Sequence, residues 1–253
     1  MNSKAIGESL KRWFNSTGFP LEIEAARSFK HASFSVEQSS AYVDPETEKG
    51  REIDLLAYRR DATGCFNAFF AVECKSSDKP WVVLTSRDQH TRYGGLHIAL
   101  LSQGARHALG DNIIDYVRIY AEIFGPSCGG YALKQAFSGQ SDLAYAASVG
   151  SLKAASWISS EEELGLVFGF PVIVVNTTIY EYSESLSGEQ NFTEVPDSSF
   201  EFRAYWKQNK RAFVRIVSSA HLDSFTQKCK LLVEQYQQLF SRDIYRAFRG
   251  NIK

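Results

Sequence analysis

Residues 66–75 read FNAFFAVECK, and this stretch decides the fold. From Phe66 to Cys74 nearly every position is apolar, so both faces of the segment must be buried, as in a central strand between two layers. The run ends in Glu73 and Lys75, whose i, i+2 spacing puts both side chains on one face of a strand while Cys74 points to the other. Charged groups at the end of a buried strand need partners. The stretch therefore predicts both the centre of a sheet and a charged site at its end.

A second apolar run, residues 52–58, precedes this strand and carries Asp54. The stretch Asp61-Ala62-Thr63-Gly64 between the two runs has strong turn chemistry, which favours an antiparallel hairpin. Side chains on neighbouring strands come within reach of one shared ion. We therefore expect Asp54, Glu73 and Lys75 to meet in one place. The alternative is that Glu73 and Lys75 form an ordinary surface ion pair at the end of a core strand.

This arrangement resembles the PD-(D/E)xK nuclease superfamily, in which an Asp on one strand is followed by Glu-x-Lys or Asp-x-Lys on the next. Asp54, Glu73 and Lys75 match that motif, and the resemblance covers about residues 18–82. Ile53 stands where a Pro often precedes the first Asp, a departure that many members of the superfamily share. The resemblance implies a restriction-endonuclease-like fold of the α/β class, with an αβββαβ core and a mixed central sheet flanked by helices.

The resemblance also implies an acidic residue from the helix before the first strand, and residues 21–34 offer Glu22 and Glu24. Helical spacing puts Glu22 on the apolar face of this segment, whereas Glu24 aligns with polar positions. Glu22 is therefore the predicted helix carboxylate. The alternative is that both acids stabilise the first helical turn beside Pro20.

Oxygen donors are the ligands that Mg²⁺ prefers. The resemblance implies that Asp54, Glu73 and the backbone carbonyl of Cys74 bind Mg²⁺, with Mn²⁺ as a substitute, and that Glu22 holds a water or a second ion. Lys75 is expected to position the attacking water or to neutralise charge that grows on the phosphate. The catalytic set is thus Asp54, Glu73, Lys75 and Glu22, and the expected activity is endonucleolytic hydrolysis of phosphodiester bonds.

The expected partner is nucleic acid, DNA rather than RNA. Cutting both strands commonly needs two copies of this site, which is compatible with a homodimer. One alternative is a nuclease-like fold that serves as a nucleic-acid- or protein-binding module with weak or no hydrolysis, and another is an enzyme acting on a different phosphate ester. The formal net charge of −1 argues against a protein that coats nucleic acid, but a local basic rim would be hidden in that sum.

Hydrophobic periodicity elsewhere predicts a single domain over 1–253, with its core at about 18–84 and 140–240. Residues 88–135 are expected to form a helical insertion, and the short run 82–84 to continue the motif strand past a bend at Pro80. The other expected helices are 6–14, 21–32, 111–124, 142–157 and a C-terminal helix over 222–240. The other expected strands are 34–43, 170–182, 200–205 and 212–217, with the helix over 142–157 crossing to a parallel neighbour. The stretch 183–199 is polar and turn-rich, so no strand is expected there.

No apolar run approaches the roughly twenty residues that cross a bilayer, and residues 1–14 lack the apolar core of a signal peptide. We therefore expect a cytoplasmic protein with no membrane partner. The cysteines match no paired metal-ligand spacing, so neither disulfides nor a structural zinc is expected.

Overall fold

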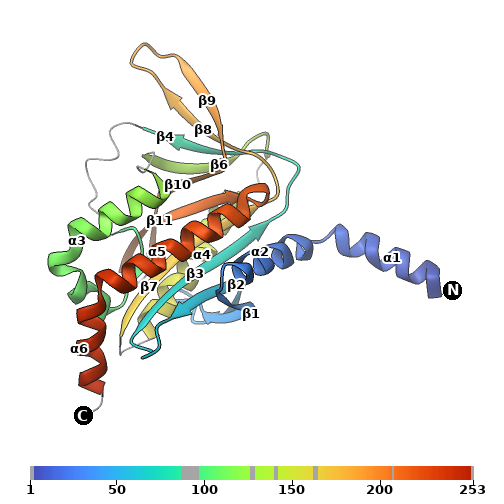
Figure 1. Ribbon diagram of the computed structural model, residues 1–253. Helices are drawn as coiled ribbons and strands as arrows, with labels where there is room; N and C mark the ends of the chain where they lie inside the picture. The colour runs from blue at the N-terminus through green and yellow to red at the C-terminus, as the bar shows by residue number, and fades with distance from the viewer. Residues whose placement is uncertain are drawn as a thin grey trace.

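The structure, a computed structural model, describes residues 3–86, 97–125, 129–139, 142–161, 165–206 and 208–251. The strands in these ranges form one eleven-stranded mixed sheet, in which most neighbouring strands run antiparallel, and helices cover both faces (Figure 1). The α/β class is therefore confirmed.

The element bounds locate each part of the sequence in this sheet. The strands are β1 (Ser35–Val43), β2 (Gly50–Arg60), β3 (Phe66–Lys75), β4 (Trp81–Thr85), β5 (Leu100–Leu101), β6 (Gly130–Gln135), β7 (Leu166–Val175), β8 (Ile179–Glu184), β9 (Gln190–Val195), β10 (Asp197–Trp206) and β11 (Gln208–Ser218). The helices are α1 (Ser3–Asn15), α2 (Phe19–His31), α3 (Gln103–Phe124), α4 (Leu143–Glu161), α5 (Leu222–Leu239) and α6 (Ser241–Asn251), with a short 3₁₀ turn at Ser219–His221.

The sheet order is β1-β2-β3-β7-β11-β10-β6-β4-β8-β9, and β5 pairs with β7. The first three strands form the predicted antiparallel meander. β3 pairs in parallel with β7 along its whole length, from Phe66 opposite Leu166 to Lys75 opposite Val175. Every residue of β3 before Lys75 is buried, as its apolar run predicted. The motif strand is therefore an interior strand.

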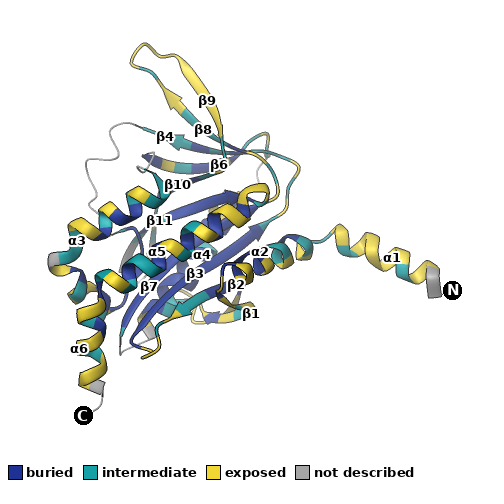
Figure 2. Cartoon of the chain, viewed as in Figure 1, coloured by how far each residue is buried: buried dark blue, intermediate teal, exposed yellow. Residues whose placement is uncertain are grey.

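Helices α2, α3 and α5 pack on one face of the sheet, and α4 packs on the other (Figure 1). Apolar positions of α5 that recur at helical spacing are buried, among them Phe225, Cys229 and Tyr236. Tyr236 stacks on Tyr116 of α3 with ring centroids 4.7 Å apart. The buried residues of α4 are mostly alanine and serine. The central strands are buried throughout, whereas α1 and β9 are largely exposed (Figure 2).

Three expectations about the strands are wrong. Residues 170–182 do not form one strand, because β7 ends at Val175 and β8 begins at Ile179 in another part of the sheet. The run 82–84 does not extend the motif strand, since it belongs to β4, which pairs with β6 and β8. The polar segment before β10 contains β9, an edge strand that pairs with β8.

Residues 88–135, expected to be an insertion, contribute to the sheet and to the core where they are described. β5 pairs with β7, and β6 lies between β4 and β10. Helix α3 begins at Gln103, earlier than expected, and buries Ala105, Leu109 and Tyr116 in the main hydrophobic cluster. This segment is thus packed into the same folded unit as the meander.

Helix α1 extends away from the sheet, as does the β8–β9 hairpin at another edge (Figure 1). Within the described residues, none of the helices combines the length and apolar character needed to cross a membrane. Cys65, Cys74 and Cys229 are buried and form no disulfide with one another, and Cys128 lies outside the described residues.

Candidate active site

The candidate site forms where the ladder between β2 and β3 ends. Backbone pairing runs as far as Leu55 opposite Val72. Beyond that pair the acceptor for β3 is the Asp54 side chain and not the β2 backbone, because Asp54 Oδ2 accepts a hydrogen bond from the backbone N–H of Cys74 at 2.7 Å. Ile53 and Leu55 are two residues apart but pack in clusters on opposite faces, so the strict alternation of β2 is interrupted here. At this interruption the Asp54 carboxylate reaches the backbone of β3.

Lys75 joins the two motif carboxylates. Its Nζ lies 2.6 Å from Glu73 Oε2 and 3.8 Å from Asp54 Oδ2. The distance between Asp54 Oδ2 and Glu73 Oε2 therefore cannot exceed the sum of these two distances. The Glu73 side chain is 11% exposed and that of Lys75 24%, so the cluster is enclosed but open on one side. The structure thus brings together Asp54, Glu73 and Lys75, as the strand spacing predicted.

The electrostatics of this cluster follow from its burial. Burial raises the pKa of Glu73 to about 7; Lys75 opposes this effect and Asp54 adds to it. Burial lowers the pKa of Lys75, but Glu73 and Asp54 outweigh it, so the net shift is upward. Lys75 is consequently a permanent cation near neutral pH.

Glu22 lies in the first turn of α2 and is partly buried. Burial raises the pKa of Glu22, and the neighbouring Asp54 and Glu52 raise it further while Lys75 lowers it. The helix carboxylate is therefore within electrostatic range of the motif residues. Among the described residues its carboxylate forms no ion pair with Lys75, so Glu22 stands at the edge of the cluster.

The charges of the cluster favour a bound cation. Asp54, Glu73 and Glu22 together face the single ammonium group of Lys75, and their mutual repulsion contributes to the raised pKa of Glu73 and Glu22. A divalent ion would balance the two excess negative charges, and the carboxylate oxygens are the hard donors that Mg²⁺ requires. Over the described ranges, no three His, Cys, Asp or Glu side chains already lie close enough together to hold a metal ion. The Cys74 carbonyl as a third ligand stays a prediction.

Tyr42 of β1 and helix α4 supply neighbours that the motif did not indicate. Tyr42 is buried, and burial together with the charge of Glu73 raises its pKa to about 12. Gly150 of α4 lies against the Glu73 carboxylate. No local pattern marks either residue, because Tyr42 reaches the site through the pairing of β1 with β2 and Gly150 through the packing of α4 on the sheet.

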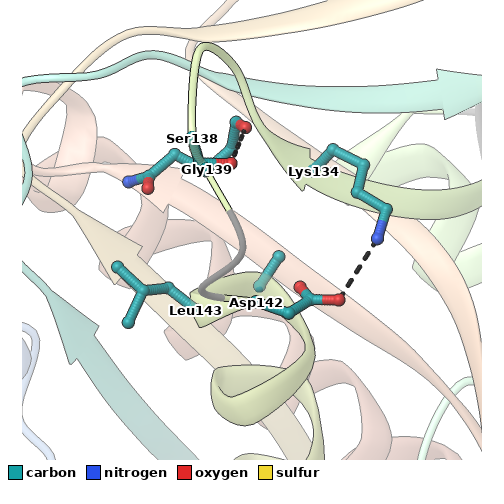
Figure 3. Close-up of a pocket in the computed structure, with 7 residues that line it drawn as sticks. Lys134, Ser138, Gly139, Asp142 and Leu143 are labelled. Carbon is teal, nitrogen blue, oxygen red and sulfur yellow. Dashed lines mark hydrogen bonds and ion pairs between the residues drawn. The ribbon is translucent and has the colours of Figure 1, made fainter.

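A separate cavity of about 290 Å³ lies between the end of β6 and the start of α4 (Figure 3). Lys134 and Asp142, which both line it, form an ion pair with Nζ and Oδ2 3.2 Å apart. Gln135, which also lines it, donates a hydrogen bond of 2.7 Å to Ser77 Oγ, two residues beyond Lys75. None of the predicted site residues lines this cavity.

Comparison with protein families, with curated proteins and with solved structures finds no match to this chain. Function must therefore be inferred from the side chains of the site.

Proposed function

We propose that this protein is a metal-dependent nuclease that hydrolyses phosphodiester bonds, more specifically an Mg²⁺-dependent endonuclease acting on DNA, with a restriction-endonuclease-like core. The observation that carries the proposal is the contact of one lysine ammonium with both an aspartate and a glutamate at the parted ends of two neighbouring strands. The resemblance of Asp54, Glu73 and Lys75 to the PD-(D/E)xK motif supports the same conclusion.

Asp54 and Glu73 are the residues that would hold Mg²⁺. The Glu22 carboxylate, which is within electrostatic range of both, would hold a water or a second ion. When bound, the ion supplies Lewis acidity toward the phosphate and a water of lowered pKa. Asp54 is oriented for this role by the Cys74 N–H, and Glu73 by Lys75.

Lys75 acts as a cation and hydrogen-bond donor. Its raised pKa keeps the proton on Nζ, so it does not serve as a general base near neutral pH. The Lys75 side chain is 24% exposed, so an anionic phosphate can reach it. A compact point charge at this position stabilises the extra negative charge of the transition state.

The test is a cleavage assay on linear, circular, single-stranded and RNA substrates, with Mg²⁺ or Mn²⁺ and with chelator. We expect the wild type to cut DNA only when a divalent ion is present, and Lys75→Met to lose cutting. Lys30→Ala, which removes an exposed lysine at the other end of α2, is the matched control and should cut like the wild type. Binding of nucleic acid with no cutting under any condition would contradict the proposal and favour a binding module.

A further inference from the structure

The backbone of α4 comes unusually close to the Glu73 carboxylate at Gly150. A Cβ atom built on Gly150 would lie 2.5 Å from Glu73 Oε1 and 3.0 Å from Glu73 Cδ. Real Cβ atoms do not approach other heavy atoms so closely, so a side chain at this position is incompatible with the observed place of the carboxylate. The hydrogen that glycine carries in place of Cβ faces Oε1 instead. Glu73 is thus held between two groups, with Oε1 toward Gly150 and Oε2 toward Lys75.

Of the groups at this contact, only the glutamate side chain can change its position. The backbone of Glu73 is held by pairing with β7, opposite Ile173, and α4 packs against β3 and β7 with small buried residues such as Ala147 and Ser151. The carboxylate, in contrast, is the far end of a side chain with several rotatable bonds. A methyl group at position 150 would therefore move the carboxylate rather than the helix.

A buried ion pair fixes the position of α4 relative to the sheet. Lys153, about one helical turn beyond Gly150, extends to the turn between β1 and β2. Its Nζ lies 2.9 Å from Asp44 Oδ1 and 2.8 Å from Glu46 Oε2, and its side chain is only 8% exposed. Two further hydrogen bonds, from the backbone N–H groups of Glu46 and Thr47, hold the Asp44 carboxylate. We name this set, Lys153 with Asp44 and Glu46, the α4 clamp.

We propose that Gly150 is a positioning residue of the candidate site: the bare helix backbone at this point sets where the Glu73 carboxylate lies, and the α4 clamp holds the helix there. The functional consequence rests on the proposed nuclease activity. The structural consequence, the placing of Glu73 against Lys75, does not depend on it.

The test compares Gly150→Ala with Gly7→Ala, since both replace a glycine inside a helix and a Cβ on Gly7 meets nothing within 4 Å. Gly150→Ala should keep the melting temperature, because alanine favours helix and the glutamate side chain can move. Its kcat for DNA should fall by about 10- to 100-fold with little change in KM, as expected for a displaced catalytic group. Gly7→Ala should cut like the wild type.

A double-mutant cycle with Glu73→Asp shows whether the effect passes through the carboxylate. Aspartate is one methylene shorter and leaves room for a methyl group at position 150. In the Glu73→Asp background, Gly150→Ala should therefore change kcat by less than about twofold. An equal loss of kcat in both backgrounds would overturn the proposal, because Gly150 would then act through some other group.

The ¹⁵Nζ signal of Lys75 gives a readout that needs no cutting. Gly150→Ala should shift this signal, because the 2.6 Å contact with Glu73 Oε2 changes, and Gly7→Ala should leave it in place. In the Glu73→Asp background Gly150→Ala should not move it. If the wild type cuts no substrate, the proposed activity fails while this signal still decides the role of Gly150. An unmoved signal in Gly150→Ala would overturn the positioning role.

Discussion

The carboxylate of Asp54 accepts the backbone N–H of Cys74, the residue between Glu73 and Lys75, at 2.7 Å. One side chain of the motif thus binds the backbone that carries the other two. The bond fixes the orientation of Asp54 Oδ2 and satisfies a backbone donor at the point where the ladder between β2 and β3 ends. The spacing of the motif residues is therefore set by the strand pair itself.

Asp54→Asn should separate the structural role of this residue from its chemical one. The asparagine carbonyl oxygen can still accept the Cys74 N–H, so the fold should be retained, but the negative charge that binds the cation is lost. We expect kcat for DNA cleavage to fall by about 100-fold or more. Asp115→Asn, at an exposed carboxylate on α3, is the control and should leave kcat unchanged.

Lys75→Met should destabilise the protein in a pH-dependent way. Without the ammonium group the enclosed Glu73 carboxylate has no counter-charge, which should cost about 1–3 kcal/mol at pH 8, less than for a fully buried pair because Lys75 is partly exposed. At pH 5 Glu73 can take up a proton, so the deficit should shrink. Urea unfolding at both pH values measures this, and an equal deficit at pH 5 and pH 8 would contradict the assigned partner.

Wild-type stability should fall as the pH rises toward neutrality in the absence of divalent ions. The pKa of Glu73 is about 7 in the folded protein against an ordinary value of 4.5, so the folded state binds more protons between these limits. The stabilisation is fully present below about pH 4.5 and is lost as the pH rises through about 7, a change of about 3 kcal/mol. Glu73→Gln should remove most of this slope, leaving the smaller part that Glu22 contributes, and saturating Mg²⁺ should abolish it. A slope that persists undiminished in Glu73→Gln would assign it to another group.

The α4 clamp should contribute far more to stability than an exposed pair of the same chemistry. Lys153→Met leaves the buried Asp44 carboxylate without its main partner, which should cost about 2–4 kcal/mol. Lys134→Met breaks the exposed pair with Asp142 and should cost less than about 1 kcal/mol. Thermal or urea unfolding of both variants tests the contrast, and comparable losses would show that Lys153 is not held as described.

Local pattern was sufficient to predict the meander and the motif. The two-residue period of a strand places Glu73 and Lys75 on the same face in any pairing register. The run before them is apolar on both faces and predicts an interior strand. Both properties depend only on residues close in sequence. The convergence of Asp54 followed from the hairpin turn between the two strands.

The features that local sequence pattern does not predict depend on tertiary packing and on strand pairing. Lys153 and Asp44 are 109 residues apart, and their pairing depends on how α4 crosses the sheet. Gly150 resembles any helical glycine until the Glu73 carboxylate is placed beside it. No hydrophobic pattern marks β9, because its residues are polar and exposed, yet an edge strand needs backbone pairing on one side only. The boundary between β7 and β8 has no clear signal either, because apolar residues continue on both sides of it.

Calorimetric titration with Mg²⁺ tests the central claim most directly, because it asks whether Asp54 and Glu73 together bind a divalent ion. We predict a binding heat for the wild type that is lost in Asp54→Asn and in Glu73→Gln and retained in Asp115→Asn. No heat in the wild type, or the same heat in the wild type and in both site variants, would contradict the claim.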